Sequence, residues 1–238
     1  MITYFIKLWH QWKELLYDSK FKWSLFAGIS LLCIAFYINF RAALYTDSIP
    51  VISVGDVILD FTRKFDLSHL EGLLSGIFTF GIYFVVLFVT FYPILFKPER
   101  VPFTAKTIAA FILIRAFFIS LTHIGAPVDY FRLPQLEDQP GVFKFFYMND
   151  LFFSGHTGFP FLVALLFWDK LIIRWFFVIM SILQGCTVLL MRVHYSIDVF
   201  SAYFITYSIY VVSDKIFNNL NLSFKKIVIQ IEERMGIK

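Results

Sequence analysis

The chain has 238 residues, of which 59% are hydrophobic, 32 are Phe and only 16% are charged. A water-soluble domain of this size has too little interior to bury so much apolar surface, so the composition excludes a soluble globular protein and indicates lipid as the solvent. The formal net charge of +4 is accounted for by orientation in the membrane and affinity for anionic head groups, and we expect no nucleic acid partner.

Six apolar stretches, each of about 20 residues, have the length needed to cross a bilayer. They cover residues 23–40, 72–96, 104–124, 151–168, 171–191 and 194–212. Only helices and closed barrels satisfy their backbone hydrogen bonds in lipid, and such continuous runs are typical of helices. The pattern therefore predicts an all-α polytopic protein with six transmembrane helices, in one membrane domain over residues 23–212.

Mixed apolar and basic segments flank this domain. Residues 1–22 and 213–238 are predicted to be amphipathic helices on the membrane surface. Most Lys and Arg residues fall on the side that the two termini share, and the positive-inside rule then places both termini in the cytoplasm. The loops over residues 41–71 and 125–150 are expected on the opposite face.

Two of the predicted helices begin with polar residues that membrane spans rarely contain. SGHT, with Ser154 and His156, opens the fourth helix, and HYSID, with His194 and Asp198, opens the sixth. Asp198 follows His194 by four residues, about one helical turn, so its carboxylate is expected to accept a hydrogen bond from the imidazole. Both helices start on the non-cytoplasmic side, so the two histidines are expected to converge near the outer leaflet.

Further polar residues suit the binding of a phosphate group. Arg115 lies inside the third predicted helix, where a cation needs an anionic partner, either Asp198 or a phosphate. Asn149, Asp150 and Ser154 stand at the start of the fourth helix, where free backbone amides bind anions. We expect these four residues to bind substrate.

Two imidazoles, a carboxylate and an arginine are suited to phosphoryl-group transfer. One histidine, kept basic by its carboxylate, attacks phosphorus, and the other protonates the departing oxygen. No carboxylate, Cys or His cluster has metal-ligand spacing, so we expect no metal and no other cofactor.

Each feature also has a structural interpretation. In SGHT alone, His is more often a packing residue, and Ser and Thr commonly bond back to helix carbonyls. His194 and Asp198 alone suit a proton relay equally well, and Arg115 alone suits a structural salt bridge. The combination of the first two features at one depth favours a catalytic site.

SGHT and HYSID resemble the second and third signatures of the lipid phosphatase and phosphotransferase superfamily that includes type 2 phosphatidic acid phosphatases. NDLFFSGHT and HYSIDVFSAYFIT, and more loosely IRAFFISLTHIGAPV and SIPVISVGDVILD, are similar to its sphingomyelin synthase branch. The resemblance implies a six-helix membrane enzyme whose site faces away from the cytoplasm. It also implies that His194 is the nucleophile, Asp198 its orienting partner and His156 the general acid and base.

The sequence departs from the phosphatase branch in its cations and around SGHT. Val188 stands where that branch has Arg, Phe153 stands where it has Pro, and no Lys-rich first signature precedes the site. Fewer cations favour a phosphodiester, which is a monoanion, over a phosphate monoester, which is a dianion. We therefore predict a head-group phosphotransferase with a glycerophospholipid donor and a lipid alcohol, ceramide or diacylglycerol, as acceptor.

Two other functions are compatible with the same residues. With water as acceptor, the site would be that of a lipid phosphate phosphatase or a phospholipase C-type hydrolase. In a different class of protein, a proton-coupled transporter or a non-enzymatic membrane protein, His194 and Asp198 would relay protons. The sequence leaves the head group, the acceptor and the oligomeric state open.

Overall fold

A computed structural model describes residues 2–131 and 149–234. Within these residues the fold is all-α as predicted, without a β-strand, and one isolated bridge joins Ile52 and Ile124. The elements in chain order are α1 (Ile2–Tyr17), α2 (Ser19–Ser48), α3 (Val57–Thr62), η1 (Ser68–Leu70), α4 (Glu71–Phe96), η2 (Pro98–Arg100), α5 (Val101–Leu121), α7 (Gly155–Leu166), α8 (Leu171–Leu190) and α9 (Ser196–Arg234). Residues 132–148, most of the second predicted outer loop, lie outside the described residues.

Five helical stretches are long and apolar enough to cross a membrane. They are Ser19–Ser48, Ser68–Phe96, Pro98–Leu121, Leu171–Leu190 and Ser196–Phe217. Each overlaps one of the predicted spans, and together they identify an integral membrane protein. Local chemistry sets some of their ends: the Asp18 carboxylate, for example, accepts the Phe21 amide at 2.8 Å and caps the start of α2.

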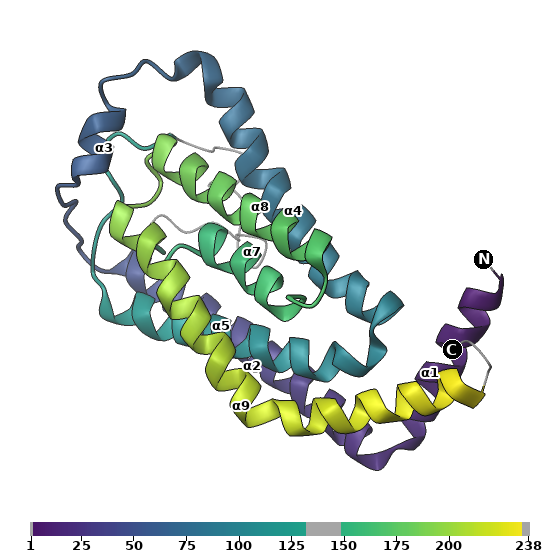
Figure 1. Ribbon diagram of the computed structural model, residues 1–238. Coiled ribbons are helices and arrows are strands. Elements are labelled where there is room, and N and C mark those ends of the chain that lie inside the picture. The colour runs from purple at the N-terminus through teal and green to yellow at the C-terminus, as the bar shows by residue number, and fades with distance from the viewer. Residues whose placement is uncertain (1, 132–148, 235–238) are drawn as a thin grey trace.

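The predicted span over residues 151–168 differs from the others. The helix found there, α7, has only 12 residues, and these rise about 18 Å against a hydrocarbon core of about 30 Å. Helices α4, α8 and α9 pack around α7, which occupies the middle of the bundle (Figure 1). Because non-helical backbone is tolerated at membrane depth when protein covers it, α7 does not need the length of a lipid-exposed span.

Close packing around α7 depends on a residue without a side chain. A Cβ at Gly158 would lie 2.7 Å from Thr206 Oγ1 of α9 and 3.1 Å from Phe111 Cε2 of α5. A larger residue would therefore force the Thr206 and Phe111 side chains to move. Similarly, a Cβ at Gly28 would lie 3.2 Å from the Pro102 carbonyl oxygen, at the contact between α2 and α5.

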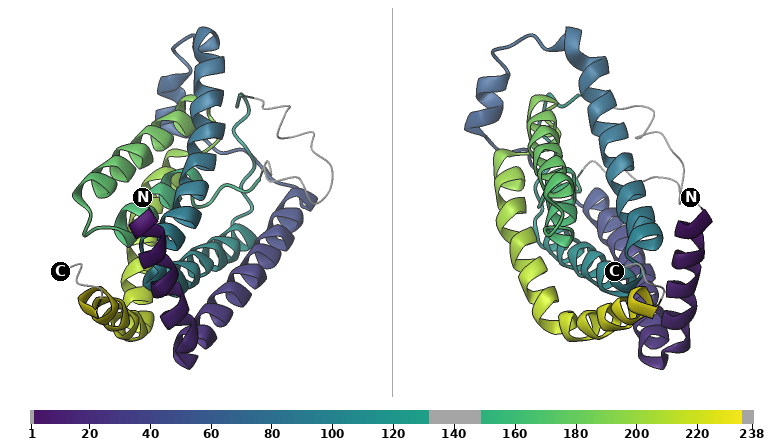
Figure 2. Two further views of the ribbon diagram at one scale, coloured as in Figure 1. Left: turned by 90° about the vertical axis from the view of Figure 1, so that its right-hand side faces the viewer. Right: turned by 45° about the vertical axis from the view of Figure 1, so that its right-hand side comes forward.

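The two terminal segments pack on each other. Helix α9 continues unbroken across residue 213, and its C-terminal half lies against α1 (Figure 2). A separate buried cluster is formed there by Leu15, Phe21, Phe224 and Val228. Lys7 Nζ also lies 2.9 Å from Glu232 Oε1. The two segments predicted to be amphipathic thus share an apolar contact.

Candidate active site

His194 and Asp198 form the predicted contact, although not within one helix. His194 lies in the turn between α8 and α9, and its Nδ1 is 3.3 Å from Asp198 Oδ2 in the first turn of α9. The same oxygen accepts the Tyr195 amide at 2.9 Å. Both side chains are buried, and Asp198 is completely so. A carboxylate is favoured at this position because the amides at a helix N-terminus carry partial positive charge.

His156 is the second residue of α7. Its ring stacks on Phe78 of α4, with a centroid separation of 3.9 Å and an interplanar angle of 20°. His156 Nε2 is buried without a hydrogen-bond partner among the described residues. His156 lies within electrostatic range of both His194 and Arg115.

Ser154 connects the two histidine-bearing elements. Its amide donates to the Asp198 carbonyl oxygen at 3.0 Å, which fastens the start of α7 to the first turn of α9. Its hydroxyl oxygen accepts the Thr157 amide at 3.4 Å and caps α7. Ser154 is fully buried. The residue predicted to bind substrate therefore lies between the histidines, with its hydroxyl engaged in capping.

Arg115 and Asp150 are partners. Arg115 Nη1 lies 2.7 Å from Asp150 Oδ1, Nη2 donates to the Asp150 carbonyl oxygen at 3.1 Å, and Nε donates to the Phe153 carbonyl oxygen at 2.9 Å. Asp198, one of the two partners considered for Arg115, is therefore not in contact with it: the Asp198 carboxylate faces the α8–α9 turn, while residues 150–153 pass along α5. Arg115 still borders the site, because a Cβ at Gly155 would lie 3.3 Å from its Nε.

Asn149 is bound on the side away from α7. The backbone N–H of Asn149 donates to Asp47 Oδ1 at 3.2 Å, and the side-chain oxygen of Asn149 accepts the backbone N–H of Ala126 at 3.4 Å. A weaker contact at 3.5 Å joins its side-chain nitrogen to the Thr46 carbonyl oxygen. These bonds hold the lead-in to α7 against the end of α2, which is a role in positioning the segment.

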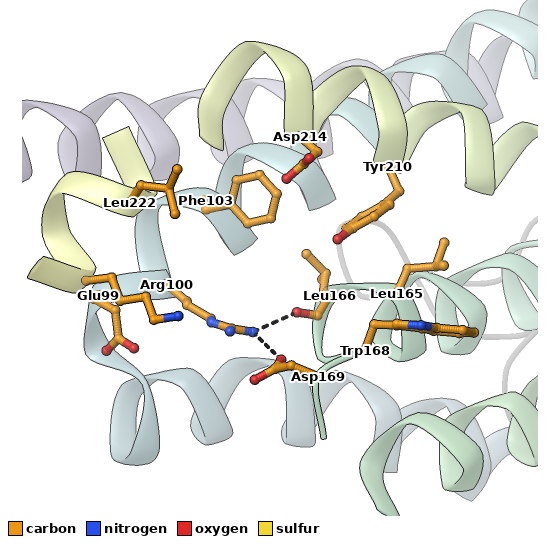
Figure 3. A pocket seen from close by; sticks show the side chains of 11 residues that line it. Glu99, Arg100, Phe103, Leu165, Leu166, Trp168, Asp169, Tyr210, Asp214 and Leu222 are labelled. Carbon is orange, nitrogen blue, oxygen red and sulfur yellow. Dashed lines mark hydrogen bonds and ion pairs between the residues drawn. The ribbon is translucent and has the colours of Figure 1, made fainter. Parts of the chain in front are cut away.

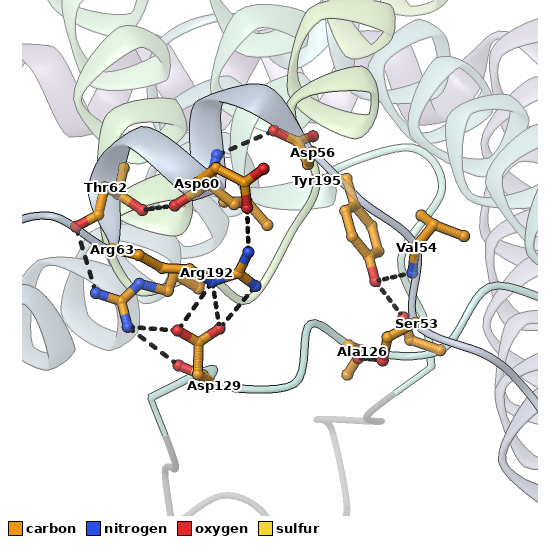
Figure 4. Close-up of polar contacts among 12 residues, drawn as sticks. Ser53, Val54, Asp56, Asp60, Thr62, Arg63, Ala126, Asp129, Arg192 and Tyr195 are labelled. Atoms are coloured by element: carbon orange, nitrogen blue, oxygen red, sulfur yellow. Dashed lines mark hydrogen bonds and ion pairs between the residues drawn. The ribbon is translucent and has the colours of Figure 1, made fainter.

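An ion-pair network next to the α8–α9 turn was not anticipated from the sequence. The Asp129 carboxylate accepts Arg63 Nη2 and Arg192 Nη1, each at 2.9 Å, and Arg63 also pairs with Asp60 (Figure 4). Arg192 adopts a left-handed backbone conformation with φ of 57°. The hydrogen bond from Arg63, with the charges of both arginines, holds the pKa of Asp129 below its ordinary value of 3.8. The network joins two outer segments to the turn that carries His194.

From the sequence, no role was assigned to Asp56 and Tyr195 either. The Asp56 carboxylate accepts the Ser196 amide at 2.7 Å, and the Tyr195 hydroxyl donates to the Gly125 carbonyl oxygen at 2.8 Å. Burial acts to raise the pKa of Asp56, but hydrogen bonds from the Leu59 and Ser196 amides outweigh it and lower this pKa below 3.8. One signal was readable in advance, since Asp directly before a short apolar helix is a preferred N-cap.

Two hollows in the described part of the protein lie away from the histidines. A cavity of about 220 Å³ lies at the C-terminal end of α7, where Arg100 Nη1 is 2.8 Å from Asp169 Oδ1 (Figure 3). An apolar groove of about 430 Å³ follows α4 and α8 and includes Gly76 and Leu183. No group of three or more His, Cys, Asp or Glu side chains in residues 2–131 and 149–234 is arranged to hold a metal.

Comparison with known proteins found a similarity that falls in the C-terminal half of the chain. Residues 149–215, which contain Asp150, Ser154, His156, His194 and Asp198, match the family model described as PAP2 superfamily C-terminal. No curated protein and no solved structure matches the chain. The match does not separate the sphingomyelin synthase branch from the others. The matched residues are thus similar to the type 2 phosphatidic acid phosphatase superfamily, and this similarity supports lipid phosphatase or phosphotransferase chemistry in general.

Proposed function

We propose that the protein is a lipid head-group phosphotransferase of the sphingomyelin synthase type. It moves a phospho-alcohol from a glycerophospholipid to a lipid alcohol through a phosphohistidine intermediate. The observation that carries the proposal is the docking of α7 on α9, which brings His156 within electrostatic range of His194 while Asp198 lies against the His194 ring. The match of residues 149–215 agrees with this class of chemistry.

The two histidines have different roles in the proposed reaction. With its proton on Nδ1, His194 donates to Asp198 and keeps a lone pair on Nε2 for attack on phosphorus. A phosphorus–nitrogen bond forms, and the bond from phosphorus to the diacylglycerol oxygen breaks. His156 gives this oxygen a proton.

The second half of the reaction regenerates the enzyme. His156, now deprotonated, takes the proton of the acceptor hydroxyl, and the acceptor oxygen attacks phosphorus. The phosphorus–nitrogen bond breaks and returns the lone pair to His194. The transferred group ends on the acceptor lipid, and both histidines regain their starting protonation.

The charge of the site supports a phosphodiester donor. Arg115 is the cation at the start of α7, and Asp150 neutralises it at 2.7 Å. A site with little net positive charge stabilises a monoanionic phosphodiester better than a dianionic monoester. We place the site on the non-cytoplasmic face, because the distribution of Lys and Arg puts the two termini in the cytoplasm.

A second candidate is hydrolysis. The superfamily of the matched family model includes phosphatases. With water in place of the lipid alcohol, the same first step would lead to a phosphatase or a phospholipase C-type enzyme. A phospholipase C-type enzyme would differ from the transferase only in what attacks the phosphohistidine, whereas a phosphatase would also take a phosphate monoester as donor.

Purified protein with head-group-labelled phospholipid and a lipid alcohol tests the proposal. Label in a new lipid together with diacylglycerol is the expected result. Label in a water-soluble phospho-alcohol would instead establish hydrolysis, and inorganic phosphate from phosphatidic acid would establish a phosphatase. His123→Ala is the matched control for the His194→Ala and His156→Ala variants, because His123 is an exposed histidine bonded to the Ser120 carbonyl oxygen, outside the site. Absence of all three products would refute an enzymatic role.

A further inference from the structure

Asp56 is bonded to the start of two helices at once. Its Oδ1 accepts the Ile58 and Leu59 amides at 2.9 and 3.0 Å, which caps α3. Its Oδ2 accepts the amide of Ser196, the first residue of α9, at 2.7 Å. The first amides of a helix have no acceptor within the helix, so Asp56 satisfies donors of two elements that are 140 positions apart.

The bond to Ser196 affects which groups Asp198 binds. Tyr195 and Ser196 both present amides at the start of α9, and Asp198 is the carboxylate of that first turn. Because Asp56 occupies the Ser196 amide, Asp198 Oδ2 serves the Tyr195 amide and the His194 ring. Without Asp56, the Ser196 amide would attract the Asp198 carboxylate, whose Oδ1 has no hydrogen-bond partner among the described residues, and this would turn the carboxylate away from His194.

Tyr195 also attaches the start of α9 to the segment that precedes α3. Its side chain is 1% exposed, its hydroxyl donates to the Gly125 carbonyl oxygen, and the Val54 amide donates to that hydroxyl at 3.1 Å. In Figure 4 the Tyr195 side chain points from the turn to Val54, which lies two residues before Asp56. Both residues that follow His194 are therefore anchored to the residues that lead into α3.

We infer that Asp56 is a positioning residue for the His194–Asp198 pair, acting through the amide of Ser196 at the start of α9. It touches neither the reacting atoms nor His194 itself. Its importance for turnover rests on the proposed function, whereas its effect on the orientation of His194 does not.

Asp56→Asn tests the inference with little change in volume. An amide side chain has one oxygen and therefore cannot accept from both α3 and α9. Because a displacement of a catalytic group by about 1 Å can lower the rate about 10²-fold, we expect kcat to fall by that order with KM unchanged. Asp60→Asn is the matched control: Asp60 lies on the same segment, pairs with Arg63 and has no bond to α9, so kcat should stay within twofold.

A measurement that does not need turnover separates this inference from the proposed function. In protein labelled with ¹⁵N-histidine, the His194 signals, assigned with a His194→Gln variant, report which ring nitrogen carries the proton. We expect the Nδ1-protonated form in the wild type and in Asp60→Asn, and a loss of that form in Asp56→Asn. A thermal melt confirms that each variant is folded, and Asp56→Ala repeats the test if Asn retains the Ser196 bond.

Equal His194 spectra in folded Asp56 and Asp60 variants would overturn the positioning role. Loss of the Nδ1-protonated form with no detectable turnover in the wild type would uphold it and refute the proposed function instead.

Discussion

Arg115 and Asp150 form a 2.7 Å ion pair beside the N-terminus of α7, although they are 35 positions apart in the chain. Their side chains are only 12% and 13% exposed. The pair is neutral as a whole, so it anchors residues 150–153 to α5 without adding net charge next to His156. The pair stabilises the fold, and under the proposed function it also favours a phosphodiester donor.

Asp150→Asn should lower the stability of the protein and change its preference between donor lipids. Breaking a buried pair from one side costs about 3 kcal/mol of unfolding free energy or more, because Arg115 is left uncompensated. In the protein that remains folded, the added positive charge should raise kcat/KM for phosphatidic acid relative to that for a phosphodiester lipid. Parallel assays of the two donors measure this ratio.

Asp169→Asn is the control for that prediction. It breaks the 2.8 Å pair with Arg100 at the far end of α7, so it should leave the donor ratio unchanged. A ratio that stays at the wild-type value in Asp150→Asn would argue against charge as the basis of donor selection.

The two histidines should differ in a trapping experiment. His194→Ala removes the nucleophile, and turnover should fall by about 10³-fold or more with the protein still folded. His156→Ala lacks only the proton donor, so a donor lipid with an activated leaving group should still phosphorylate it. Acid-labile, base-stable label on denatured protein measures the intermediate. Label on His194→Ala but not on His156→Ala would reverse the assignment of roles.

Accessibility of introduced cysteines tests the orientation of the site. In a Cys33→Ser, Cys186→Ser background, a cysteine at Val128, which is 83% exposed, should react with an impermeant reagent from the non-cytoplasmic side. A cysteine at Lys170, in the exposed turn between α7 and α8, should react only after the membrane is opened. The opposite pattern would place both termini, and not the histidines, on the non-cytoplasmic face.

Acid should weaken the outer network around Asp129. Its pKa in the folded protein lies below the ordinary value of 3.8, so its ion pairs contribute stability above that pH and lose it as pH falls toward the folded pKa. The melting temperature of detergent-solubilised protein should therefore drop as pH falls below about 4. Asp129→Asn should melt lower near neutral pH and show a smaller further drop in acid. An identical acid response in the two proteins would exclude Asp129 as a source of the transition.

Local patterns in the sequence were sufficient for much of the architecture. The apolar runs predicted the five stretches that are long enough to cross a membrane, because burial in lipid requires continuous hydrophobicity. The His194–Asp198 contact also followed from spacing, since residues four apart meet in a helical turn and nearly meet when the helix starts between them, at Ser196. The candidate residues of the C-terminal half were predicted from SGHT and HYSID, because polar runs are conspicuous in an apolar part of the chain.

Contacts between distant segments were decided only by the tertiary structure. Asp150, and not Asp198, pairs with Arg115 because residues 150–153 return past α5 before α7 begins. Helix α7 can be as short as 12 residues because neighbouring helices pack around it. Asp56 reaches Ser196 across 140 positions. No local pattern encodes such pairings, because they depend on how whole helices pack and on which polar groups packing leaves without a partner.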